Sequence, residues 1–404
     1  MKLFVLLSRV PYPLEKGDKL RAYHLIKHLA DKHEVYLFCL SDQPIEREHL
    51  EHLRGFCHHL QVVRLARWRI LLKLVLATFG RLPYQVAYFH HRQAQRRIDA
   101  ALEDFRPDHI LCQLVRTTEY VRHQYGTPKT LDYMDTLSKG MERRADTAPW
   151  PFRPLLHAET RRLIAYENLM FDLFDNRIII SAQDRDFIYH PKRAEMVVIP
   201  NGVDTAFFRP MDQEPVHDLV FTGNMNYPPN IDSVLYLVQR VLPLVRARRS
   251  DTDLVISGVA PGARIRELAA RDPHVHVTGW VRDIRGSYAS ARLFVAPMQI
   301  GTGLQNKLLE AMAMGIPCIT SSLANNAVGA PPGEAILIGR EPEEYAEHIL
   351  RLLDDGEERM RIARNGHRFV LANFDWQRAA KVLDRAIAGA TLPAGTEQPP
   401  AQVG

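Results

Sequence analysis

Apolar residues in the first part of the chain follow the two spacings that distinguish strands from helices. Residues 2–7 form an apolar run of strand length, residues 18–30 carry apolar positions at helical spacing, and residues 34–40 form a second run. A strand, a helix and a strand within about forty residues form a βαβ unit, which joins two parallel strands. Three later runs also have strand length: 109–114, 130–133 and 177–181. The pattern therefore predicts a parallel α/β sheet.

A second alternating series begins after VIPNGVDTAFFRP (residues 198–210), a segment with two prolines, an Asn-Gly pair and neither spacing. Its strand-like runs are 218–222, 253–257, 274–278, 292–296 and 316–320, and the helical stretches between them are 231–241, 263–270, 284–289 and 305–314. We therefore predict two doubly wound, Rossmann-like α/β domains. The first spans 1–198 and is joined by a C-terminal helix over 375–390. The second spans 199–374, and the Pro-, Gly- and Gln-rich tail 391–404 is expected to be disordered.

Length and composition agree with this division. A chain of 404 residues exceeds one ordinary core, and 46% hydrophobic with 25% charged residues is typical of a soluble globular protein. No apolar run is long enough to span a membrane, and the N-terminal MKLFVLLSRVPYP fits a strand better than a signal peptide. The four cysteines have no paired spacing, which favours a reducing compartment and disfavours a structural zinc site. We therefore expect a cytoplasmic protein without a metal.

Positive charge is concentrated in one window of the first domain. The net charge is only +5, but no acidic residue occurs between residues 52 and 98, where nine arginines and lysines lie. Within this window RLARWRILLKLVLATFG (residues 64–80) has the composition of a helix that lies on an anionic membrane surface. The alternative is a core helix with solvated basic residues. We therefore expect peripheral association with the inner face of a membrane through residues 64–97, and no nucleic-acid partner, because no recognised binding module is present.

The stretch GTGLQNKLLEAMAMGIPCIT (residues 301–320) places glycines, a lysine and a glutamate around one predicted helix start. A strand leads into the loop 297–304, so this loop is expected at the carboxyl edge of the sheet, where open parallel sheets bind ligands. Gly301 and Gly303 allow the backbone to approach a ligand closely. The free amides of a first helical turn favour an anion such as a diphosphate, and Lys307 adds a positive charge.

Glu310 follows Lys307 by about one helical turn and would repel a phosphate, so it is expected to contact another group. A carboxylate can accept hydrogen bonds from two neighbouring ribose hydroxyls, and the combination therefore fits a nucleoside diphosphate. An ordinary surface ion pair between Lys307 and Glu310 is the alternative. The GTGLQN segment lacks the third glycine of a dinucleotide fingerprint, and the chain contains no Gly-Lys-Ser/Thr of a P-loop.

The segments IPNGVDTAFFRP and KLLEAMAMGIPCIT together resemble the retaining nucleotide-sugar glycosyltransferases of family four, which have the GT-B fold with a cleft between two Rossmann-like domains. PYPLEKGDKLRAYHLIKHLA is similar to the first loop and helix of their acceptor domain, FTGNMNYPPNID to the first strand and loop of their donor domain, and VTGWVRD to the turn near the nucleobase. The patterns PYPxxKGDKLR, FTGNMxYxPN and GTGxxNKxLEAMAMG further resemble the sugar transferases associated with exopolysaccharide and exosortase/PEP-CTERM gene clusters. The resemblance covers most of the chain.

Carried over by position, the resemblance implies that Lys307 neutralises the leaving diphosphate and Glu310 binds the donor ribose. It implies further donor contacts at Gly17, Asp18, Gly223, Asn224, Val281, Arg282, Gly301, Thr302, Gly303 and Leu304. Thr302 stands where the family usually has the first of two glutamates, and Asn224 and Pro229 stand where it often has an arginine and a lysine. Lys307 would therefore carry more of the charge than in the family pattern.

Candidates for the acceptor side lie on the first helix or follow first-domain strands: Arg21, His24, Gln113, Arg116 and Asp135. For His24, packing on an amphipathic helix is the alternative. Arg21 and Arg282 are also candidates to assist Lys307 with the diphosphate charge.

The resemblance implies a hexosyltransferase-type enzyme that moves a sugar from a nucleotide diphosphate sugar to a hydroxyl of a glycan or lipid-linked acceptor, in exopolysaccharide synthesis. It implies retention at the anomeric carbon, with the donor phosphate taking the acceptor proton and with no cofactor or metal. The alternatives are a GT-B-fold nucleotide-sugar epimerase and a non-catalytic sugar-nucleotide-binding homologue. A periplasmic-type binding protein would need export, for which the N-terminus gives no signal.

Overall fold

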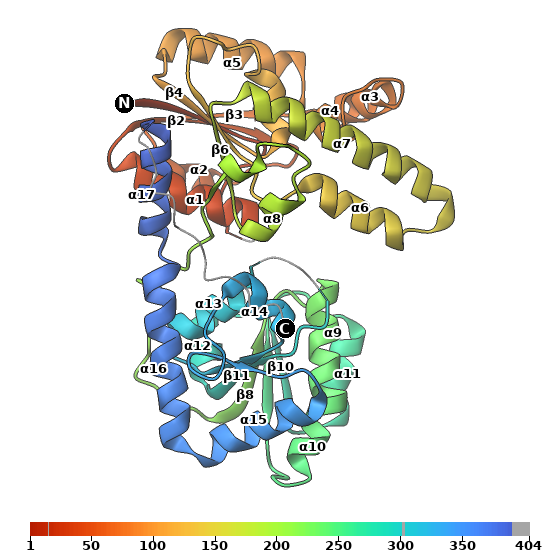
Figure 1. Ribbon diagram of the computed structural model, residues 1–404, viewed down its shortest axis with the longest axis vertical. Coiled ribbons are helices and arrows are strands. Elements are labelled where there is room, and N and C mark those ends of the chain that lie inside the picture. The colour runs from red at the N-terminus through yellow and green to blue at the C-terminus, as the bar shows by residue number, and fades with distance from the viewer. Residues whose placement is uncertain (15, 301–303, 390–404) are drawn as a thin grey trace. The chain divides into compact units, whose positions relative to one another are not determined.

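The computed structural model describes residues 1–14, 16–300 and 304–389, which form two compact units. The first unit comprises Met1–Asn201 and the segment that begins at Trp376, and the second comprises Gly202–Asp375. Each unit is built around its own sheet, and every pair of neighbouring strands is parallel (Figure 1). The prediction of two doubly wound α/β domains is confirmed. The expected tail, 391–404, lies outside the described residues.

The sheet of the first unit has the order β3-β2-β1-β4-β5-β6-β7 in the described part of the chain. Its strands are β1 (Lys2–Leu7), β2 (Glu34–Ser41), β3 (His59–Arg64), β4 (His109–Gln113), β5 (Lys129–Asp132), β6 (Asn176–Ile179) and β7 (Val197–Val198). Its helices are α1 (Gly17–Ala30), α2 (Arg47–Arg54), α3 (Arg67–Thr78), α4 (Tyr84–Phe89), α5 (Arg92–Phe105), α6 (Leu137–Thr147), α7 (Arg153–Leu173), α8 (Ala182–Phe187) and α17 (Trp376–Ile387). Short 3-10 turns lie at Val115–Tyr120, Trp150–Phe152 and Arg193–Glu195.

Helices cover both faces of this sheet because successive strand residues point to opposite sides. Phe4 and Leu6 of β1 belong to a core shared with α5 and α7, whereas Leu3, Val5 and Leu7 belong to a second core with α1, α2 and α17. Figure 1 shows α17 in blue beside the red α1, so the end of the described chain packs against its beginning. Both faces of β1 are therefore buried, which explains why it reads as a continuous apolar run.

The sheet of the second unit has the order β10-β9-β8-β11-β12-β13. Its strands are β8 (His217–Thr222), β9 (Leu254–Ser257), β10 (Val275–Gly279), β11 (Ala291–Ala296), β12 (Cys318–Thr320) and β13 (Leu337–Ile338). Its helices are α9 (Pro228–Tyr236), a π-helical turn (Leu237–Val241), α10 (Leu242–Arg246), α11 (Ala263–Arg271), α12 (Ile284–Ala289), α13 (Asn306–Ala313), α14 (Ser322–Val328), α15 (Pro342–Asp354) and α16 (Gly356–Asn373). The strand order reverses between β8 and β11, which makes their carboxyl ends the topological switch point.

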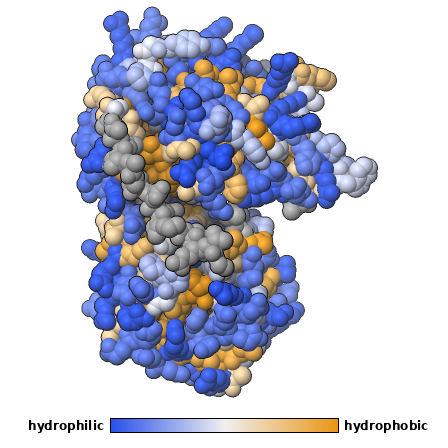
Figure 2. Space-filling model, viewed as in Figure 1, coloured by the Kyte–Doolittle hydropathy of each residue, from blue (hydrophilic) through white to orange (hydrophobic). Residues whose placement is uncertain are grey.

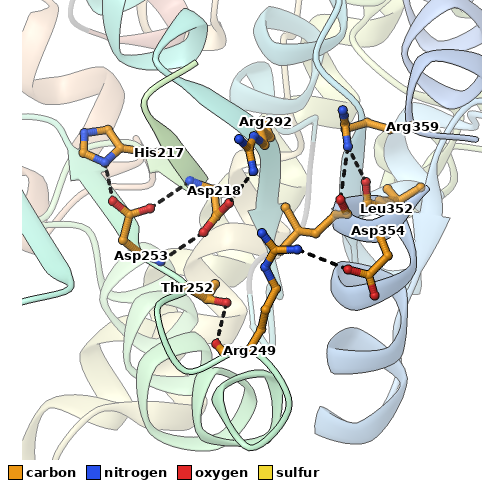
Figure 3. A network of polar contacts seen from close by, with 10 residues as sticks. His217, Asp218, Arg249, Thr252, Asp253, Arg292, Leu352, Asp354 and Arg359 are labelled. Carbon is orange, nitrogen blue, oxygen red and sulfur yellow. Dashed lines mark hydrogen bonds and ion pairs between the residues drawn. The ribbon is translucent and has the colours of Figure 1, made fainter. Parts of the chain in front are cut away.

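A polar network ties together the amino-terminal ends of the central strands in the second unit (Figure 3). His217 Nδ1 lies 2.6 Å from Asp253 Oδ2, and Arg292 Nη1 donates to Asp218 Oδ1 at 3.1 Å. His217, Asp253 and His276 also present possible metal-ligand atoms within 4.8 Å of one another. The Asp253 carboxylate already accepts hydrogen bonds from His217 and from the Asp218 amide, 2.8 Å away. We therefore infer that these three side chains hold the strands in alignment. They lie at the sheet edge opposite to the candidate site.

Candidate functional site

The predicted helix start lies at the switch point of the second sheet. β11 ends at Ala296, and α13 begins at Asn306 and brings Lys307 and Glu310 to the carboxyl edge. The predicted contacts Gly301, Thr302 and Gly303 lie outside the described residues. Leu304 is partly buried and packs against the hydrophobic core of the unit.

Lys307 is a partly buried cation whose described hydrogen-bond partners are all neutral. Its Nζ donates to Asn230 Oδ1 at 2.5 Å and to Gln305 Oε1 at 3.3 Å, and it lies 5.4 Å from the centroid of the Phe221 ring. Burial lowers the pKa of Lys307 to about 8, although the charge of Glu310 acts in the opposite direction. Within the described ranges no carboxylate forms an ion pair with Lys307. The surface-pair alternative therefore does not hold for this arrangement.

Glu310 likewise has a neutral partner. Tyr288 of α12 donates its hydroxyl proton to Glu310 Oε2 at 2.7 Å, and Thr222 Oγ1 at the end of β8 donates to the Tyr288 hydroxyl at 2.6 Å. Burial raises the pKa of Glu310, and the Tyr288 hydrogen bond and the Lys307 charge act against this rise. Among the described residues no hydrogen bond ends on Oε1. The chain Thr222–Tyr288–Glu310 thus holds the carboxylate by one oxygen.

Glycine at the end of β8 allows these groups to approach one another. Gly223 has a φ of 154°, and a Cβ there would lie 2.7 Å from Asn230 Nδ2 and 3.4 Å from Lys307 Cε. Asn230 Nδ2 in turn donates to the Asn224 carbonyl at 2.9 Å while its Oδ1 accepts from Lys307. The structure therefore brings Gly223 and Asn224 to Lys307. It also gives a contact to Asn230, a fixed position of the FTGNMxYxPN pattern to which the sequence analysis assigned no role.

Val281 and Arg282 lie in the turn after β10, at the same carboxyl edge but outside the contacts of Lys307. Arg282 is exposed, and in the described part of the chain it makes no hydrogen bond to Lys307 or Glu310. β9 and β8 separate this turn from β11 in the sheet. The structure thus does not place Arg282 as an assistant to Lys307.

A second polar group lies at the carboxyl edge of the first sheet. Asp18 at the start of α1, next to the exposed Gly17, pairs with Arg9 Nη1 at 2.6 Å. Gln113 Nε2 at the end of β4 donates to the Asp18 carbonyl at 3.1 Å. Arg116 donates from Nη2 to Gln85 Oε1 at 2.7 Å, and it and the exposed Asp135 are close enough to influence each other's charge. The predicted Gln113, Arg116 and Asp135 thus share one edge, and Arg9 and Gln85 are additions.

Arg21 and His24 are buried inside the first unit, which corrects their prediction as acceptor-side residues. Arg21 is 0% exposed and donates from Nε to Asp132 Oδ2 at 2.7 Å and from Nη1 to the Ile199 carbonyl at 2.8 Å. The His24 ring stacks on Trp376 of α17 with centroids 5.0 Å apart. Arg21 therefore joins α1 to two strand ends, and His24 joins α1 to α17. Neither offers its side chain to a ligand in this structure, and Arg21 is not available to assist Lys307.

Comparison with known proteins relates the second unit to a known family. Residues 216–355, which contain the switch point, Lys307 and Glu310, match the family described as "Glycosyl transferases group 1". The part of the second unit that carries the candidate site is therefore similar to group 1 glycosyltransferases. The chain is also 22% identical over 397 residues to an uncharacterised 44.6 kDa protein in the cps region of Klebsiella pneumoniae, covering 93% of this chain and 96% of that protein.

Further similarities cover part of the chain or concern the fold alone. A GDP-mannose-dependent α-(1-6)-phosphatidylinositol monomannoside mannosyltransferase of Mycobacterium tuberculosis is 29% identical over 47% of this chain and 55% of its own length. The structure of Anabaena HepE in complex with UDP superposes with a TM-score of 0.68 at 13% identity, covering 96% of this chain and 100% of that one. The chain therefore has the GT-B fold.

Proposed function

We propose that this glycosyltransferase transfers a hexose from a nucleoside diphosphate sugar to an acceptor hydroxyl, with retention at the anomeric carbon. One observation carries the proposal: Lys307 and Glu310 lie about one helical turn apart at the switch point, and each has only neutral described partners. A charge that is partly removed from water and forms no ion pair is costly, so a site that keeps two such groups is suited to a ligand that supplies direct partners. A nucleoside diphosphate supplies an anion for Lys307 and vicinal hydroxyls for Glu310.

The proposed chemistry centres on the leaving diphosphate. As the bond between the anomeric carbon and the diphosphate oxygen breaks, negative charge grows on that oxygen, and the Lys307 ammonium stabilises it. The acceptor oxygen bonds to the anomeric carbon on the same face, and its proton passes to a phosphate oxygen of the donor. Glu310 keeps the ribose, and with it the diphosphate, in register with Lys307.

We place the acceptor at the polar edge of the first unit, where Gln113, Arg116 and Asp135 lie. The relation to a cps-region protein favours a growing polysaccharide or its lipid-linked precursor as the acceptor. Among donors, GDP-mannose and UDP-glucose are the first to test, because similar proteins are described as GDP-mannose-dependent or are bound to UDP-glucose.

Calorimetric titration with a panel of UDP-, GDP- and ADP-sugars tests the proposal. We expect one nucleotide series to bind with a Kd in the micromolar to millimolar range, as is common for enzyme substrates. The protein is then incubated with the donor that binds, with and without a polysaccharide acceptor. This experiment distinguishes transfer of the sugar to the acceptor from release of free sugar. Absence of binding across the panel would refute the proposal. Formation of an epimerised sugar nucleotide without acceptor would replace it with the epimerase alternative.

A further inference from the structure

Helix α3 carries a continuous apolar face that the rest of the described first unit leaves open. Trp68 is 63% exposed, Leu71 64% and Phe79, directly after the helix, 89%. The other members of this set, which we call the α3 face, are Leu72, Val75 and Leu76, each more than half exposed. Figure 2 shows hydrophobic colour on the surface over α3 at the upper right of the view. Isolated exposed apolar residues are ordinary, but a set of six on one helix indicates a contact surface.

The α3 face is not the core side of the helix. Ile70 and Ala77 are buried, and Leu74 packs partly against the same core. With about 100° of rotation per residue, these three positions lie roughly opposite to the centre of the α3 face. The helix is therefore apolar on both sides, and the unit buries only one of them. This decides against the core-helix alternative that the sequence left open.

The charged residues of α3 itself are all positive: Arg67, Arg69 and Lys73. Arg67 and Arg69 flank the α3 face, and their guanidinium groups donate to the neutral amides of Gln43 and Gln93 at 3.2 and 2.8 Å. Arg69 also lies 5.0 Å from the Trp68 ring. No carboxylate pairs with either arginine in the described ranges, in keeping with the absence of acidic residues between positions 52 and 98.

The C-terminal end of α3 is held firmly by the long helix α7. Arg162 donates from Nη1 to the Ala77 carbonyl at 2.9 Å and from Nη2 to the Thr78 carbonyl at 3.1 Å. The segment leading into α7 exposes two more aromatic residues, Trp150 and Phe152. The α3 face is thus presented by a helix that is anchored to α7, and it is exposed in the folded structure.

We propose that the first unit docks on an anionic lipid bilayer through the α3 face, with α3 lying in the plane of the interface. The apolar side chains would enter the boundary between headgroups and acyl chains, and the flanking arginines would remain at the lipid phosphates. No helix in the described residues is long and apolar enough to span a bilayer. This inference does not depend on the donor site and goes beyond the transfer reaction.

Charge favours a bilayer over a second copy of the chain. In a symmetric dimer through the α3 face, the same surface of both copies would meet, and their unpaired arginines would be brought together. An anionic lipid surface supplies the opposite charge along the whole helix.

Vesicle flotation of the full chain tests the proposal, with vesicles of phosphatidylcholine alone and of phosphatidylcholine with about one third phosphatidylglycerol. We expect binding to the anionic vesicles that weakens with added salt. The double variant Leu72→Glu/Leu76→Glu should lower the partition coefficient at least about tenfold, because it removes apolar burial and adds two anions. The matched control Met360→Glu/Leu371→Glu changes two similarly exposed residues of α16 in the second unit and should bind as the wild type does.

Three results would overturn the inference. The wild type could fail to float with anionic vesicles, the α3 variant could float as well as the control, or the α3 variant could lose self-association by light scattering while vesicle binding stays unchanged. A circular dichroism spectrum and nucleotide-sugar titration of the α3 variant identify misfolding. If that variant is misfolded, Trp68→Ser replaces it, and equal flotation of that variant and the wild type would also overturn the inference. If the wild type binds no nucleotide sugar but still floats with anionic vesicles, the proposed function fails and this inference stands.

Discussion

The two units each bury charged groups near the carboxyl ends of their strands, but they treat them differently. In the first unit, Arg21 is paired with Asp132 and has two further acceptors, the Ile199 carbonyl and Asn201 Oδ1 at 3.1 Å. In the second unit, Lys307 and Glu310 carry opposite charges on one helix, yet each hydrogen-bonds to neutral described groups. A paired charge holds a fold together, whereas an unpaired charge is available to a ligand. The comparison therefore favours a structural role for the Arg21 cluster and the proposed ligand-binding role for Lys307 and Glu310.

Removal of the paired cation should have the largest effect. Arg21→Met leaves the buried Asp132 carboxylate without its counter-charge, which typically costs about 3–5 kcal/mol of stability. Urea denaturation followed by circular dichroism measures the free energy of unfolding of the first unit. The double variant Arg21→Met/Asp132→Asn should recover part of the loss. A single variant as stable as the wild type would show that the pair is not structural.

Removal of the unpaired cation should affect turnover more than stability. Lys307→Ala deletes the charge that stabilises the leaving diphosphate, and loss of one such donor typically lowers kcat about 100-fold or more. The thermal midpoint should change by only a few degrees, because the described partners of Nζ are neutral. The control is Lys381→Ala, which changes an exposed lysine of α17. Wild-type turnover by Lys307→Ala would end the catalytic assignment.

Removal of the unpaired anion should weaken donor binding by a smaller factor. Glu310→Gln keeps the shape of the side chain but removes a charged acceptor, and hydrogen bonds to charged groups contribute about 1.5–3 kcal/mol. Calorimetry with the nucleoside diphosphate and its 2′-deoxy analogue forms a double-mutant cycle. We expect the wild type to discriminate between the two ligands and Glu310→Gln to lose that discrimination. Equal discrimination by both proteins would exclude ribose as the partner of Glu310.

The pH dependence of donor binding should be the mildest effect. Burial lowers the pKa of free Lys307 to about 8, and a bound diphosphate favours the charged form and raises this pKa. Affinity should therefore be pH-independent well below 8 and fall by up to about tenfold per unit as pH rises above 8, while binding takes up a proton. Lys307→Arg stays charged and should flatten this profile. A profile shared by both proteins would assign the titration to another group.

The amino-acid sequence predicted the second unit better than the first, for physical reasons. In the second unit apolar strands alternate with amphipathic helices, so the pattern gave five of the six described strands and the four helical stretches between those five. In the first unit the pattern did not indicate α7, because it buries Glu159 and Glu167 on its inner side. These carboxylates accept from the Tyr84 amide at 2.9 Å and from the Ser138 amide at 3.1 Å, so inward polar positions interrupt the apolar spacing. β3 was missed because it lies within the basic window.

The candidate site was predicted in the same uneven way. Lys307 and Glu310 share one helix, so local spacing and the family motif found both. Tyr288 and Asn230, which hold them, come from other helices, and only the fold brings these side chains together. For Arg21 the sequence predicted a ligand contact that the structure does not support. An arginine on an amphipathic helix is expected to be exposed, and its buried carboxylate partner lies more than a hundred residues away in the sequence.

The central claim is that α13 begins at a cradle for a nucleoside diphosphate. A crystal structure of the protein with the best-binding nucleoside diphosphate tests it directly. We predict Lys307 Nζ within about 3 Å of a phosphate oxygen and both ribose hydroxyls at the Glu310 carboxylate. A nucleotide bound elsewhere, with Lys307 still on Asn230 and Glu310 still only on Tyr288, would contradict the account.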